Sequence, residues 1–125
     1  MTTSEFTEST LKPRLRELEF NQLVMFTEDL AEEIRVHAAQ GASDQEWMDA
    51  QAMCVAEEAG EFIKAYRKWR GFARTAGSVN DVHEELADVI IASLLMFSVM
   101  NYDAQRHIKD KLYQVITRGY VNKPG

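Results

Sequence analysis

The apolar residues of this chain recur at spacings of three to five, and no stretch alternates apolar and polar residues as a half-buried strand does. Such stripes run along residues 15–40, 44–70, 79–101 and 104–118. A repeat near 3.6 residues places the apolar positions on one face of a helix. The pattern therefore predicts an all-α fold with four helices.

Capping and stop signals set the limits of these helices. Ser43 and Glu46 have the spacing of a capping box, and Ser78 and Asp103 are good N-caps for the third and fourth helices. Gly41 and Gly71 stand where the first two stripes end, as glycine often does after a helix. The segment from Phe72 to Gly77 has no periodicity and is expected to be a loop, either an ordinary exposed one or one that reaches over a bound nucleotide.

The two ends of the chain are polar. Residues 1–12 are rich in threonine, serine and glutamate, and Pro13 suits the first turn of a helix. We expect a mobile tail over residues 1–12, one domain over residues 13–120 and a short tail over residues 121–125. A length of 125 residues fits one domain with a real core.

The stripe at 79–101 becomes apolar on nearly every side after Val89. A helix without a polar face is buried on both sides, and a four-helix domain of this size covers only one of them. We therefore expect a second copy of the chain to cover the other side, giving a homodimer or homotetramer built on this helix.

Two pairs of carboxylates stand among the apolar positions. Glu58 and Glu61 lie three residues apart, and so do Glu85 and Asp88, so each pair occupies one helix face within a single turn. Carboxylates beside a buried face are expected to be protonated or to hold a cation, because unpaired buried charge is very unfavourable. Oxygen ligands select magnesium, calcium or manganese, and magnesium commonly accompanies phosphates. The pairs predict a hard-metal site.

A simpler interpretation stays open at this point. Glutamates on helices usually form solvated faces with basic partners about one turn away, and Lys64 and Lys68 offer such partners. Lys111 and Arg118 lie seven residues apart, nearly on one face, where they would address successive phosphates or simply be solvated near a helix end.

The net charge of −6 disfavours nonspecific binding to nucleic acid. An acidic protein still binds a polyphosphate when a cation or a local basic cluster lies between them. Cys54 is the single cysteine and is expected to be buried, so no intramolecular disulfide forms. The N-terminus lacks a signal-peptide pattern, and no apolar run is long enough to span a membrane, so we expect a cytoplasmic protein that does not bind membranes.

The acidic pairs also resemble a known signature. Glu57-Glu58-Ala59-Gly60-Glu61 followed by Glu85-Leu86-Ala87-Asp88 resembles the E-E-x-x-E and E-x-x-D motifs of the MazG-like, all-α nucleoside triphosphate pyrophosphohydrolases. The segment from Lys111 to Arg118 is similar to the basic residues that follow the second acidic pair in many members. The likeness extends from about Glu19 to Tyr120.

The resemblance implies a four-helix MazG-like bundle completed by oligomerisation, and hydrolysis of a ribo- or deoxynucleoside triphosphate between its α and β phosphates. It implies that Mg²⁺, with Mn²⁺ as a substitute, is held by Glu58, Glu61, Glu85 and Asp88, one of which orients or deprotonates the attacking water. Lys111 and Arg118 would neutralise phosphate oxygens. Trp47, Trp69 and Phe72 are candidates to stack on the base, and the alternative is that each belongs to the core. The sequence does not select the base, the sugar or the carboxylate that activates water.

Other classes of metal or nucleotide site lack their residues. No histidine follows a glutamate at the spacing of a di-iron bundle, His83-Glu84 is not followed by a second zinc-binding histidine, and no glycine-lysine phosphate loop is present. The remaining alternative is a non-catalytic helical domain that binds nucleotides or partner proteins. Since all four carboxylates of the signature are present, the sequence favours the enzyme.

Overall fold

The computed structural model describes residues 8–37 and 40–120, and within these ranges it is helical with no strand, which confirms the all-α class. The elements, in chain order, are α1 (Glu8–Arg16), α2 (Phe20–His37), α3 (Asp44–Trp69), α4 (Val79–Val99), α5 (Ala104–Val115) and a π-helical turn, η2 (Ile116–Tyr120). No helix within the described ranges combines the length and apolarity that a membrane span requires.

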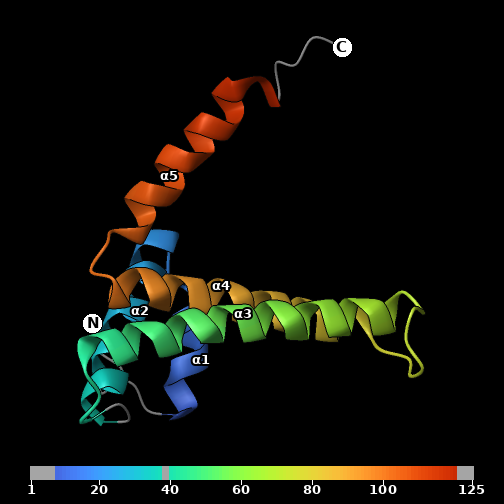
Figure 1. Ribbon diagram of the computed structural model, residues 1–125, viewed down its shortest axis with the longest axis horizontal. Helices are drawn as coiled ribbons and strands as arrows, with labels where there is room; N and C mark the ends of the chain where they lie inside the picture. Colours follow the sequence, from blue (N-terminus) through green and yellow to red (C-terminus); the bar gives the residue numbers. More distant parts are fainter. Residues whose placement is uncertain (1–7, 38–39, 121–125) are drawn as a thin grey trace.

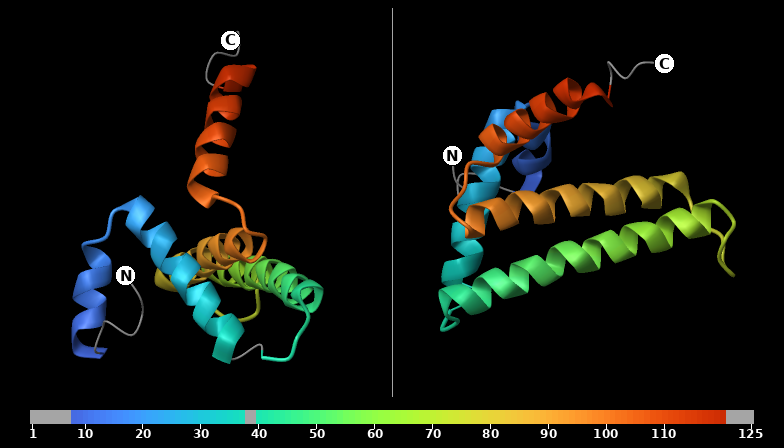
Figure 2. Two further views of the ribbon diagram at one scale, coloured as in Figure 1. Left: turned by 90° about the vertical axis from the view of Figure 1, so that its left-hand side faces the viewer. Right: turned by 45° about the horizontal axis from the view of Figure 1, so that its top comes forward.

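The two longest helices, α3 and α4, form an antiparallel hairpin, and α2 crosses α4 near the end of the hairpin where α3 begins (Figures 1 and 2). The expected caps set the limits of this hairpin. Ser43 accepts a hydrogen bond from Glu46 N at 3.1 Å, and the Glu46 side chain accepts one from Ser43 N, so the capping box is complete. Ser78 caps α4 through Asp81 N, at 3.1 Å.

The small core lies where α2, α4 and the start of α5 meet. Val24, Leu94 and Ala104 are buried there, and Phe97 packs against them. A buried polar contact joins the hairpin, because Gln51 Nε2 donates to Ala92 O across the two helices at 3.0 Å. That bond satisfies an amide that would be costly to bury alone.

The expected four-helix bundle is not confirmed within one chain. α5 starts beside the end of α4 and then extends away from the hairpin (Figure 1). The apolar stripe along α5 and η2 is consequently open to solvent, with Ile108, Leu112 and Ile116 exposed by 38%, 57% and 43%. The packed unit of the described residues is therefore the α3–α4 hairpin with α2 across it.

The N-terminal part differs from expectation. We expected residues 1–12 to form a tail and one helix to run from about Leu15 to Gln40, but α1 begins at Glu8, contains Pro13, and ends at Arg16. Glu19 N donates to Gln22 Oε1 at 2.8 Å, which starts a new helix at Phe20. This side-chain cap explains the break, since it satisfies an amide that a continuous helix would have bonded internally.

Cys54 also differs from expectation, since it is exposed on α3 rather than buried. The tail expected at residues 121–125 and the first seven residues of the expected N-terminal tail lie outside the described residues.

Candidate metal and phosphate site

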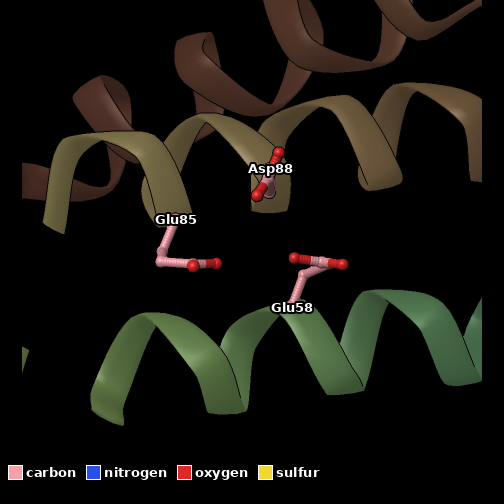
Figure 3. A group of neighbouring side chains, drawn as sticks. All are labelled: Glu58, Glu85 and Asp88. Atoms are coloured by element: carbon pink, nitrogen blue, oxygen red, sulfur yellow. The ribbon is translucent and has the colours of Figure 1, made fainter. Parts of the chain in front are cut away.

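Three of the four predicted carboxylates meet in the hairpin. Glu58 of α3 and Glu85 and Asp88 of α4 each offer a carboxylate oxygen, and these oxygens all lie within 4.8 Å of one another. In Figure 3 the carboxyl groups of Glu58 and Glu85 extend into the space between the two helices. We call these three residues the acidic cluster.

The packing of the hairpin explains why these side chains face each other. Gln51 and Ala65 are buried on the side of α3 that meets α4, and Glu58 lies midway between them, seven residues from each. Seven residues are nearly two turns, so the three positions share one face. On α4, Glu85 stands three residues after the buried Val82, which brings it to the same seam.

Glu61 does not join the acidic cluster but lies beside it. It lines a cavity of about 160 Å³ between the hairpin helices, on the side toward the connecting loop. We call this the lysine cavity, and its lining residues are Glu61, Lys64, Ala65, Lys68, Gly77, Asp81 and Glu85. Acidic residues and two lysines thus line one space next to the acidic cluster.

Lys64 and Lys68 are site residues that the sequence interpretation treated only as surface partners of glutamates. The spacing rule that paired Glu58 with Glu61 reaches Lys64 three residues later, so extending it along the same helix face would have found this lysine. No ion pair within 4.0 Å joins Lys64 or Lys68 to a carboxylate among the described residues. Both ammonium groups are thus available to an anion.

The end of the loop between α3 and α4 forms one wall of the lysine cavity. A Cβ atom added to Gly77 would lie 2.8 Å from Lys68 Cβ, closer than side chains pack. The backbone at Gly77 therefore lies directly on α3, and only glycine allows this approach.

The two predicted phosphate ligands lie elsewhere in the chain. Lys111 is on α5 and Arg118 is in η2, and this arm extends away from the hairpin in all views (Figures 1 and 2). Neither residue lines the lysine cavity. Their role in phosphate binding stays a prediction that depends on a second copy of the chain.

The predicted base-stacking residues lie in three different settings. Trp47 is half-buried near the start of α3, where the Arg35 guanidinium lies 5.9 Å from its ring centre. Trp69 makes an edge-on contact with Tyr66 at 5.9 Å. Phe72 is 63% exposed in the loop beyond α3, with the Arg70 guanidinium 5.8 Å from its ring centre. Phe72 thus has the most open ring of the three.

Glu85 is the carboxylate whose proton affinity the fold changes. Burial raises the pKa of Glu85 above its ordinary 4.5, and repulsion from Asp88 and then Glu58 raises that pKa further. Each of these effects opposes the ionised form of Glu85. A cation bound between the carboxylates would have the opposite effect, because it favours the ionised form of Glu85.

The acidic cluster fits a hard divalent cation. Metal–oxygen distances of about 2.0–2.6 Å put ligand oxygens on opposite sides of a Mg²⁺ or Ca²⁺ ion about 4–5 Å apart. The spacing of the three carboxylates, within 4.8 Å, is compatible with that range. Their oxygen-only chemistry disfavours zinc and copper.

The raised pKa of Glu85 leads to a pH-dependent prediction. In EDTA, above pH 4.5, Glu85 keeps its proton in the folded protein to a higher pH than in the unfolded chain. The contribution of Glu85 to the free energy of unfolding therefore decreases as the pH rises. Mg²⁺ binds the ionised form, so the rise in melting temperature caused by Mg²⁺ should be small at pH 4 and increase toward pH 7. At ten times its Kd the cation stabilises by about 1.4 kcal/mol, a shift of a few degrees.

Thermal unfolding with and without Mg²⁺ measures this effect, and Glu85→Gln is the control because it removes the titrating group. We expect the variant to lose part of the fall in stability seen in EDTA. An equal Mg²⁺ effect at pH 4 and pH 7 would contradict the assignment of Glu85 to a cation site.

Comparison with known proteins gave no match: no family model, curated protein or solved structure matches this chain. What the site can do must therefore be inferred from its residues and geometry.

Proposed function

We propose that this protein is a magnesium-dependent hydrolase that cleaves nucleoside triphosphates between the α and β phosphates, as its resemblance to the MazG-like pyrophosphohydrolases implies. The observation that supports this most is the lysine cavity, which is lined by two lysines and by Glu85 of the acidic cluster. Carboxylates suit a cation, and ammonium groups suit phosphate oxygens. The acidic cluster and the two lysines lie side by side, as the binding of a metal-bound polyphosphate requires.

In this proposal Glu58, Glu85 and Asp88 hold Mg²⁺, with Mn²⁺ as a substitute, and the bound ion supplies charge neutralisation at the phosphate oxygens. The remaining chemistry belongs to the chain. Water attacks the α phosphorus, the bond from that phosphorus to the α–β bridging oxygen breaks, and pyrophosphate leaves with the bonding electron pair. Glu61 accepts the proton of the attacking water, because it borders the cavity outside the acidic cluster.

Lys64 and Lys68 neutralise the phosphates in this proposal. From Glu58 to Lys64 the axis of α3 rises by about 9 Å, and a phosphate chain running from the acidic cluster toward the loop would meet both ammonium groups. Their positive charge offsets the charge that builds up on the leaving pyrophosphate.

We also propose that the active protein is a homodimer or homotetramer. On the outer face of α4, Leu86, Ile90 and Ile91 are exposed by 42%, 52% and 43%. Exposed apolar side chains grouped on one helix favour a covering surface, and a second copy of the chain is the expected cover.

The test of the reaction is a screen of the eight common ribo- and deoxynucleoside triphosphates with Mg²⁺, in which pyrophosphate and orthophosphate are measured separately. We expect pyrophosphate and monophosphate in equal amounts, and neither in EDTA. Release of orthophosphate alone would place cleavage at another bond, and no release from any substrate would favour a non-catalytic binding protein.

Whether the phosphates are bound by the lysines of α3 or by the basic residues of α5 and η2 is also testable. Lys64→Ala should raise KM for the nucleotide about tenfold, since a charge-assisted hydrogen bond to phosphate is lost, and should leave Mg²⁺ affinity nearly unchanged. Lys111→Ala is the matched comparison, measured by the same steady-state kinetics. If Lys111→Ala raised KM and Lys64→Ala left it unchanged, the phosphates would be bound by α5 of a second copy of the chain.

A further inference from the structure

The stretch from Phe62 to Asn80 contains no aspartate or glutamate but carries five cations, although the whole chain has a net charge of −6. They are Lys64, Arg67, Lys68, Arg70 and Arg74. This stretch covers the last two turns of α3 and the loop that leads to α4. The free end of the hairpin is therefore locally basic and favours anions.

Part of this stretch encloses a second cavity, of about 510 Å³. We call it the arginine pocket, and it is lined by Gly60, Ile63, Lys64, Arg67, Phe72, Ala73 and Arg74. At 100° per residue, Gly60, Ile63 and Arg67 lie roughly opposite the buried Ala65 on α3. The pocket thus opens on the side of α3 that turns away from α4 and the acidic cluster.

The cations of the arginine pocket have no carboxylate partner among the described residues. No ion pair within 4.0 Å involves Lys64, Arg67 or Arg74 there, and no acidic residue lines the pocket. Three like charges around one space repel each other, and a bound anion relieves that repulsion. Arginine in particular binds phosphate through two parallel hydrogen bonds.

The aromatic wall of the arginine pocket is held in place. Gly71 has a φ of +80°, which turns the chain back at the end of α3. Phe72 N donates to Arg67 O at 2.8 Å, and Arg67 Nη2 donates to Phe72 O at 3.4 Å. These bonds hold the backbone of Phe72, whose ring is 63% exposed, so the pocket presents an apolar face beside its cations.

We propose that the arginine pocket binds a nucleoside mono- or diphosphate, at a site separate from the acidic cluster. The phosphates lie between Arg67 and Arg74, and the base lies on Phe72, where stacking tolerates different bases. The cavity volume is within the range of small-ligand sites. This site needs no divalent cation and contains no carboxylate, so it goes beyond the proposed hydrolysis and does not depend on it.

The test is calorimetric titration of the full chain with ADP in EDTA at low ionic strength, because EDTA removes binding that depends on a metal at the acidic cluster. We expect saturable binding of one ADP per chain. Arg74→Ala should weaken it about tenfold, since one charged partner of the phosphates is lost. Lys109→Ala, which removes an exposed cation on α5, is the matched control and should leave it unchanged.

Two further variants separate the parts of the ligand. Phe72→Ala should weaken ADP about fivefold or more and leave inorganic pyrophosphate unaffected, because only the base is stacked. Gly60→Leu should weaken both ligands, since a Cβ at Gly60 meets nothing within 4 Å and a larger side chain extends into the pocket. Circular dichroism checks that each variant keeps its helices, and Gly60→Ala serves as the small-side-chain control.

Three results would overturn the proposal. The first is no ADP binding by the wild-type chain in EDTA. The second is equal weakening by Arg74→Ala and Lys109→Ala, which would indicate a diffuse charge effect. The third is tighter binding of a short single-stranded oligonucleotide than of ADP, which would make the basic end a nucleic-acid site. None of these results bears on whether triphosphates are hydrolysed, so the two proposals fail separately.

Discussion

Glu61→Gln is expected to slow pyrophosphate release by about 10²- to 10⁴-fold, the usual contribution of a general base. The physical reason is its position. Glu61 borders the lysine cavity together with Glu85 but does not belong to the acidic cluster. Its amide analogue keeps the shape of the side chain and cannot accept a proton from water. Mg²⁺ affinity, measured by calorimetry, should change little.

Two variants control this experiment. Asp88→Asn removes a member of the acidic cluster and should reduce Mg²⁺ affinity and turnover together. Glu57→Gln changes an exposed carboxylate on the same helix, rotated by about 100° from Glu58, and should leave both quantities unchanged. If Glu61→Gln lost Mg²⁺ affinity as Asp88→Asn does, Glu61 would be a metal ligand rather than the base.

Ile90→Asp is expected to convert the protein from an oligomer to a monomer. Ile90 is 52% exposed on the outer face of α4, the face on which we propose that a second copy packs. A carboxylate buried without a partner in that interface costs about 3 kcal/mol or more, which raises the dissociation constant more than a hundredfold. Sedimentation velocity at micromolar concentration measures the change.

The matched control is Thr75→Asp, which adds the same charge at an exposed position in the loop between α3 and α4. It should sediment as the wild type does. A wild-type protein that is already monomeric, or an Ile90→Asp variant with unchanged mass, would refute an interface on this face of α4.

Local signals predicted the helices well. Ser43, Ser78 and Asp103 cap α3, α4 and α5 as expected, with the Asp103 carboxylate accepting from Arg106 N at 3.2 Å. Capping contacts join residues three positions apart, so the sequence contains all of their determinants. The break before α2 was missed because Glu19 supplies a backbone amide to Gln22 and does not resemble a usual cap residue.

The candidate site was predictable only in part. The three-residue spacing of Glu85 and Asp88 puts both on one helix face, which the structure bears out. The register that sets Glu58 opposite them depends on how α3 and α4 pack, through buried residues such as Gln51 and Ala92. The direction of α5, and hence the positions of Lys111 and Arg118, likewise depends on tertiary contacts that helical periodicity does not encode.

The contact of Gly77 with Lys68 has a consequence for how this protein acquires new ligands. The segment 72–76 is pinned at one end by the bonds between Phe72 and Arg67 and at the other by the glycine lying on α3. Substitutions inside a loop anchored in this way alter the rim of the arginine pocket and leave the helices in register. Ligand preference can therefore diverge among descendants of this chain by changes within this short segment, while the fold and the acidic cluster persist.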